Sequence, residues 1–297
     1  MAENKVGRPL PLRGLIAAAL LALMLWAGPA AAEDSPGGYI VFTAGDDDAR
    51  SIMVAGGGGG LPRVLVGSSF MDTQPAIGPQ GQVAWIRRFS LSEWALMENG
   101  RVVSKGPMHL SPTYRPDGTL VAAVSGKTET NIYAFETSGR KLLVRGGQDG
   151  FAVSPSFSPD GRWLAYAAAV GEGMQIFVAP AEGGQPGRQL TDSRELNTDP
   201  VWSPKGDFIA YVSAERDIFL VRPDGGGLKQ LTDGPGQSRS PFFSPDGQKL
   251  VFSNDRDGQW RLYIMNIDGG DQKIFLPGFP AAQRLPFWSA QAPAMKQ

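Results

Sequence analysis

Short apolar runs separated by turn residues recur along most of the chain. Runs of three or four β-branched, aromatic or other apolar residues, such as 163–166, 218–221 and 262–265, are bounded by Pro, Gly, Asp and Asn. Such runs between turn signals predict strands rather than helices. After residue 32, no segment has the apolar spacing of a helix of useful length. The chain is therefore predicted to be all-β.

A repeated phrase groups these strands into units. Five copies of Pro-x-x-x-Pro-x-Gly or a close variant begin at Pro75, Pro112, Pro155, Pro200 and Pro241, and a shortened sixth copy covers residues 286–289. Corresponding residues are 37, 43, 45, 41 and 45 positions apart, which is the repeat length of β-propeller blades with four short strands. Each phrase predicts a first strand and a tight turn, because Pro presets φ and Gly accepts positive φ.

The two ends of the chain complement each other. The first unit, residues 39–66, has three predicted strands and no phrase before it, whereas the sixth phrase ends the repeats without further strands. We therefore predict a single six-bladed β-propeller of four-stranded blades, closed by a C-terminal strand that completes the first blade. The propeller is expected to cover residues 38–290, between a short segment at 33–37 and a C-terminal tail at 291–297.

The fourth strand of each unit carries a basic residue. Because this strand is the outer edge of a blade, a charge there opposes edge-to-edge aggregation, and we prefer this structural role to a basic binding ring. The residues are Arg63, Arg101, Lys141, Arg188, Lys229 and Lys273.

The N-terminal residues 1–32 have the order of a secretory signal peptide. Lys5, Arg8 and Arg13 precede an apolar run at 15–26, and Ala30-x-Ala32 offers a cleavage site. The run is short for a membrane anchor, which is the alternative. We expect a monomeric mature protein, without a membrane span, that is periplasmic or secreted.

Composition excludes several kinds of chemistry. The chain has no cysteine, one histidine (His109) and a formal net charge of −1. Thiol nucleophiles, disulfides and multi-histidine metal sites are therefore excluded. The sequence has no basic run interleaved with aromatic residues, so binding to nucleic acid is not expected. No catalytic motif stands out either. We expect a protein-binding scaffold rather than an enzyme, without a cofactor, and a structural or surface role for His109.

The loops that enter the first strands provide candidate contacts to a partner. Four residues before the repeat proline lie Met71, Met108, Phe151 and Leu196, whereas the other two units have Gln237 and Ala282 there. Apolar residues around a channel mouth can form a partner-binding patch. The alternative is that they pack between the blades.

Two acidic loops provide a weak candidate for a calcium site, although no metal is expected. Oxygen ligands suit Ca²⁺, and ring closure would make the two loops neighbours. Asp and Asn are also ordinary turn formers, which is the simpler interpretation. The residues are Asp46, Asp47, Asp48, Asn254, Asp255 and Asp257.

The later repeats resemble the WD40-like (PD40) propeller repeat of the TolB family. Residues 155–192, 200–233 and 241–276 carry the phrase Pro-x-Trp/Phe-Ser-Pro-Asp-Gly or a close variant, and Leu-Thr-Asp ends two of them at 190–192 and 231–233. The resemblance implies a six-bladed periplasmic propeller that contacts a peptidoglycan-associated envelope lipoprotein in a Tol-Pal-like role.

The resemblance concerns the propeller domain alone. The repeats begin within about ten residues of the predicted cleavage site, which leaves no room for the N-terminal domain of TolB. The same repeat occurs in peptidase-associated propellers, so an exported enzyme or an accessory module acting on polysaccharide or peptide remains the alternative.

Overall fold

The computed structural model describes residues 37–46, 49–146, 150–214 and 216–295. All regular elements in these ranges are β-strands, which confirms the predicted all-β class for this part of the chain. Among the same residues, no helix is long and apolar enough to cross a membrane. The predicted signal peptide at 1–32 lies outside the described residues.

Four sheets each contain four consecutive strands of the chain, paired antiparallel. The first sheet contains β8 (His109–Tyr114), β9 (Leu120–Ser125), β10 (Thr130–Glu136) and β11 (Gly139–Val144). The second contains β12 (Ala152–Phe157), β13 (Trp163–Val170), β14 (Gly173–Pro180) and β15 (Arg188–Gln189). The third contains β16 (Thr198–Trp202), β17 (Ile209–Ser213), β18 (Asp217–Val221) and β19 (Lys229–Gln230). The fourth contains β20 (Ser238–Phe243), β21 (Lys249–Asn254), β22 (Arg261–Asn266) and β23 (Lys273–Ile274).

The remaining eight strands form one larger sheet that has two halves. One half contains β24 (Gln283–Ser289), β1 (Tyr39–Gly45), β2 (Arg50–Gly56) and β3 (Gly59–Val66), and the other contains β4 (Met71–Ile77), β5 (Val83–Arg88), β6 (Trp94–Glu98) and β7 (Arg101–Gly106). A single parallel pair, Arg50 with Met71, joins the halves. Within the first half the last strand of the chain pairs antiparallel with the first, from Tyr39 opposite Ser289 to Ala44 opposite Gln283.

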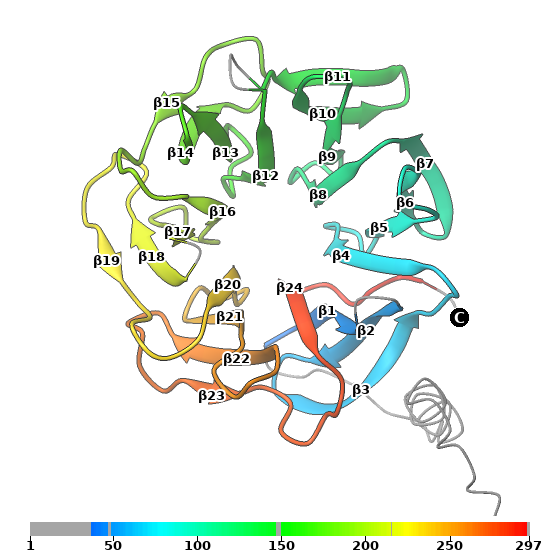
Figure 1. Ribbon diagram of the computed structural model, residues 1–297, viewed down its shortest axis with the longest axis vertical. Helices are drawn as coiled ribbons and strands as arrows, with labels where there is room; N and C mark the ends of the chain where they lie inside the picture. Colours follow the sequence, from blue (N-terminus) through cyan, green and yellow to red (C-terminus); the bar gives the residue numbers. More distant parts are fainter. Residues whose placement is uncertain (1–36, 47–48, 147–149, 215, 296–297) are drawn as a thin grey trace, which may run out of the picture. The chain divides into compact units, whose positions relative to one another are not determined.

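The inner strands of these four-stranded groups surround a common centre (Figure 1). They contact one another in the cyclic order β4, β8, β12, β16, β20, β24 and back to β4. The short strands β15, β19 and β23 lie at the outer ends of their sheets.

The hydrophobic core lies between the groups rather than within any one of them. Each buried apolar cluster of the described residues combines side chains from two consecutive groups: Val54 and Trp85 share one cluster, and Ile132 and Tyr166 share another. Because both faces of a sheet are covered in this way, β5 has four consecutive buried residues from Val83 to Ile86 instead of the alternation of a half-exposed strand.

Each inner strand contains the same backbone irregularity. The residue before the repeat proline has a positive φ of 50–53° although it is never glycine, and the register with the neighbouring strand shifts near this point. Such a conformation costs about 1–3 kcal/mol and persists where the surrounding structure enforces it, often at functional sites. The six residues are Gln74, Ser111, Ser154, Asp199, Ser240 and Leu285.

Candidate functional site

Two sets of loops lie at the same end of the antiparallel groups. One set leads into each inner strand, and the other joins the second strand of a group to the third. We call the surface that they form the entry face. The Pro-Asp-Gly turns lie at the opposite end, because the chain reverses direction at every strand.

The entry face includes the four predicted partner contacts. The side chains of Met71, Met108 and Leu196 are half-buried, whereas Phe151 is 46% exposed. The backbones of Met71, Phe151 and Leu196 form parallel bridges to the third strand of the preceding group. These bridges hold three of the four loops in equivalent positions. Partner binding by these residues stays a prediction.

The structure adds further apolar side chains to the entry face. Phe70 is 37% exposed, Leu91 is 85% exposed and Val170 is 40% exposed. The ring of Phe70 packs edge-on against Phe89 with 4.9 Å between the centroids, beside a hollow of about 300 Å³ that Met71 also lines. A single large apolar residue in the polar turn Ser90-Leu91-Ser92 is the sequence signal that could have identified Leu91.

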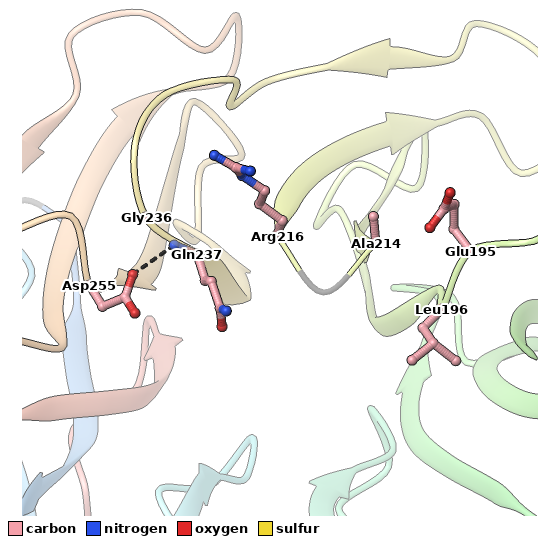
Figure 2. A pocket seen from close by; sticks show the side chains of 7 residues that line it. All are labelled: Glu195, Leu196, Ala214, Arg216, Gly236, Gln237 and Asp255. Carbon is pink, nitrogen blue, oxygen red and sulfur yellow. Dashed lines mark hydrogen bonds between the residues drawn. The ribbon is translucent and has the colours of Figure 1, made fainter.

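A hollow of about 570 Å³ lies between two neighbouring groups on the same face. It brings together loops that precede β16 and β20 and turns that follow β17 and β21 (Figure 2). The backbone N–H of Gln237 donates to Asp255 Oδ1 at 2.7 Å and fixes one wall. The lining residues are Glu195, Leu196, Ala214, Arg216, Gly236, Gln237 and Asp255.

The acidic loops proposed for calcium make contacts typical of turns. The Oδ1 of Asn254 accepts bonds from the backbone N–H and Nε of Arg256 at 2.7 and 2.9 Å. Asp257 accepts the hydroxyl of Tyr263, and Asp255 accepts Gln237 as above.

On the other loop, Asp46 Oδ1 accepts the backbone N–H of Ala49 at 3.0 Å, and Asp47 and Asp48 lie outside the described residues. Within the described part of the chain, no group of three or more His, Cys, Asp or Glu could hold a metal ion. The calcium site stays a weak candidate that no observation here tests.

His109 is fully buried beside Met108. Its Nε2 lies 2.9 Å from the hydroxyl of Ser104. Burial, together with the positive charge of Arg140, lowers the pKa of His109 to about 4, so the ring is neutral at physiological pH. This contact supports the structural role.

A third hollow, also of about 300 Å³, lies among the inner strands, and we call it the axial cavity. All six left-handed residues line it, together with the prolines that follow them. Asp199 Oδ1 accepts the hydroxyl of Ser154 at 3.2 Å, and its Oδ2 accepts the hydroxyl of Ser240 at 3.3 Å. Burial raises the pKa of Asp199, and these hydrogen bonds and the charge of Arg239 oppose the shift.

Sequence reasoning missed Asp199. The signal was available, because the position before the repeat proline is occupied by Gln, Ser, Ser, Asp, Ser and Leu, and only one of these is charged.

Comparison with known proteins connects this geometry to one family. The family model described as TolB beta propeller domain matches residues 89–221. A protein of Agrobacterium fabrum, described as uncharacterized protein Atu1656, is 34% identical over 211 residues, which cover 68% of this chain and 69% of that protein. A TolB homolog of Chlorobium luteolum is 32% identical over 160 residues, covering 52% of this chain and 35% of that protein.

One further relative is described as a peptidase rather than as a TolB protein. The uncharacterized peptidase YuxL of Bacillus subtilis is 28% identical over 207 residues, covering 52% of this chain and 31% of that protein. The chain therefore spans about a third of the length of the Chlorobium and Bacillus relatives. Among solved structures, TolB from Acinetobacter baumannii superposes with a TM-score of 0.71 at 22% identity, covering 84% of this chain and 66% of that structure.

Proposed function

The chain belongs to the TolB β-propeller family, and from this premise we propose that it is a six-bladed exported scaffold that binds a protein partner through its entry face. It has no enzymatic activity of its own in this proposal. After removal of residues 1–32 it acts in the periplasm, as a monomer, on an envelope partner such as an outer-membrane lipoprotein.

Three features support six blades in a closed ring. The inner strands contact one another in a cycle, the core clusters of the described residues lie between consecutive groups, and β24 pairs with β1. A closed ring leaves no unpaired strand between the chain ends, which stabilises a repeat structure without separate caps.

The observation that carries the function is the set of four exposed apolar side chains on the loops of the entry face. Phe70 and Leu91 belong to the group of β4–β7, Phe151 and Val170 belong to the group of β12–β15, and Met71, Met108 and Leu196 lie half-buried at the same end. Protein interfaces are built around buried aromatic and aliphatic anchors of this kind. Patches of exposed apolar surface on a soluble protein generally mark an interaction site.

A photo-crosslinking experiment tests this proposal. A benzophenone amino acid is placed at Leu91 on the entry face or at Leu61, next to the β2–β3 turn at the opposite end; their exposed fractions are 85% and 81%. In cells of the source organism, irradiation is expected to give a discrete protein adduct from position 91 and none from position 61. Equal adducts from both positions, or none from either, would overturn the proposal.

The match to YuxL favours one second candidate, an accessory propeller that presents peptides to a peptidase. That protein is described as a peptidase, and the match covers only 31% of it. Under this alternative the partner cross-linked at position 91 would itself hydrolyse peptides, and the purified propeller would change the rate. Under the scaffold proposal we expect no peptide hydrolysis by the cross-linked partner and no effect of the propeller on such a rate.

A further inference from the structure

The axial cavity contains one carboxyl side chain, that of Asp199, among lining residues without an acidic or basic group. Of the described residues that line it, Asp199 alone has a carboxyl group; the others are Ser, Thr, Gln, Pro and apolar or aromatic residues. Asp199 is half-buried, so it is reached from the cavity although it is partly desolvated. A desolvated carboxylate is unfavourable unless it is paired.

Asp72 is a buried carboxylate with a structural role, and its contacts provide a comparison for those of Asp199. Asp72 is fully buried and accepts two bonds from the guanidinium of Arg87 at 2.7 and 2.9 Å. It also accepts the indole N–H of Trp85 at 2.9 Å and the hydroxyl of Ser68 at 2.6 Å. The charge is therefore neutralised by an internal cation and the oxygens are fully hydrogen-bonded.

Asp199 lacks these contacts. The ion pairs of the described residues do not include it. Its hydroxyl contacts from Ser154 and Ser240, at 3.2 and 3.3 Å, are longer than the roughly 2.5–2.7 Å of a strong bond from a hydroxyl to a carboxylate. A carboxylate offers about four acceptor sites; the two serine hydroxyls and the backbone N–H of Ser240, which also lowers the pKa of Asp199, leave capacity for an external cation.

The walls of the cavity restrict which cation fits. Val201, Leu285 and Phe287 offer apolar surface, and the aromatic residues Tyr114, Phe157 and Trp202 line the same hollow. A lysine side chain combines an apolar stem with a compact ammonium head, and aromatic rings also attract such a head. We favour lysine over arginine because its ammonium is a compact point charge that needs a single remaining acceptor site, whereas the planar guanidinium is suited to a two-point contact with both oxygens. A divalent ion prefers several carboxylate or carbonyl oxygens.

We propose that the axial cavity binds the primary ammonium group of a lysine side chain presented by the protein partner, with Asp199 as its counter-ion. The proposal rests on the proposed function and adds to it a chemical requirement on the partner. Ser154 and Ser240 hold the carboxylate between two neighbouring inner strands, so that it faces the lysine without rearrangement.

A pair of small probes tests the proposal on the purified exported protein. The ¹⁵N-labelled protein is titrated with Nα-acetyl-lysine N-methylamide or with the norleucine analogue, which has a matching alkyl chain without the ammonium. The indole N–H resonance of Trp202 reports on the cavity lining, and a Trp202→Phe variant assigns it. We expect saturable shifts with the lysine compound and at least tenfold weaker binding of the norleucine compound.

Substitution then identifies the counter-ion. Asp199→Asn is expected to weaken binding of the lysine compound at least tenfold, whereas Asp224→Asn, at an exposed turn outside the cavity, is expected to leave it unchanged. Equal binding of the two compounds, no saturation with either, or unchanged binding by Asp199→Asn would each overturn the proposal. If one of these results accompanies a specific adduct at position 91, the scaffold function stands and the lysine requirement fails.

Discussion

At the scale of single residues, one buried ion pair has a structural role that can be tested through stability. Asp72 and Arg87 form a buried pair, and the Arg87 side chain is 17% exposed. Removing the cation of such a pair leaves an uncompensated charge in the core. This pair should therefore matter far more to stability than the ion pairs on the surface.

We expect Arg87→Met to lower the free energy of unfolding by about 3–5 kcal/mol, because it isolates the carboxylate of Asp72. Chemical denaturation monitored by tryptophan fluorescence measures the change. Arg162→Met, which breaks an exposed pair with Asp160, is the control and should leave the midpoint nearly unchanged. Similar midpoints for both variants would contradict this account of Asp72.

His109 should make stability depend on pH in a definite direction. Its pKa is about 4 in the folded protein, below its value of 6.5 in the unfolded chain, so folding favours the neutral ring. The resulting stabilisation is complete above about pH 6.5 and is lost as the pH falls toward 4. Its upper limit is about 3 kcal/mol.

Replacing the ring with an uncharged side chain should remove this dependence. We expect His109→Gln to lose less stability than the parent protein when the pH falls from neutral to about 5, as measured by urea unfolding at each pH. A parent and variant that lose equal stability over this interval would show that His109 titrates normally in the folded state.

At the level of single elements, the outer strands show how the fold protects its exposed edges. β15, β19 and β23 are only two residues long, and β3, β7 and β11 are longer. The six predicted basic residues lie on these outer strands and are exposed. A basic side chain matters most where the strand is long and apolar, because such an edge can pair with another chain.

β7 is the strand where this protection can be tested. Arg101 precedes Val102 and Val103, which are 46% and 38% exposed. We expect Arg101→Val to increase aggregation at unchanged melting temperature, as measured by light scattering during incubation below the transition. The control is Lys229→Val, on the two-residue strand β19, which should aggregate no faster than the parent protein.

Strands and turns could be predicted from the sequence because the repeat supplies them many times over. The apolar runs and the Pro-Asp-Gly turns identify the strands even where a single run would be ambiguous. The left-handed residues could not be predicted in the same way: Ser111, Ser154 and Leu285 have no common side-chain preference for positive φ. Their conformation follows from tertiary packing around the centre, which propensities do not include.

For the whole molecule, the junction of the chain ends is the element on which the proposed closed ring depends. β24 contributes Trp288 to the cluster between the last group and the first, and Phe287 packs against Phe242 with 4.2 Å between the ring centroids. Loss of the strand removes these contacts and leaves β1 unpaired on one side.

We expect deletion of residues 284–297 to destabilise the protein by several kcal/mol, because a buried strand is lost. Deletion of 290–297 is the control, since it retains β24. Thermal unfolding of the two truncations measures the difference. Equal melting temperatures would contradict the closed ring.

Only part of the candidate site could be predicted from the sequence. Repeat alignment identified the loops and placed Met71, Phe151 and Leu196 in equivalent positions, because one period relates them. It could not show that Phe151 is more exposed than its counterparts, or that Asp199 faces neighbours from two other strands. Those facts depend on how consecutive groups meet.

The most direct test of the scaffold account compares two aromatic residues at opposite ends of the blades. Phe151 on the entry face is 46% exposed, and Trp163, next to a Pro-Asp-Gly turn, is 44% exposed. With the partner identified by cross-linking at position 91, binding of the Phe151→Asp and Trp163→Asp variants is measured by calorimetry after both are shown to melt like the parent protein. The account predicts at least tenfold weaker binding for Phe151→Asp, as expected for loss of an aromatic anchor, and unchanged binding for Trp163→Asp. Unchanged binding by Phe151→Asp, or equal losses in both variants, would contradict it.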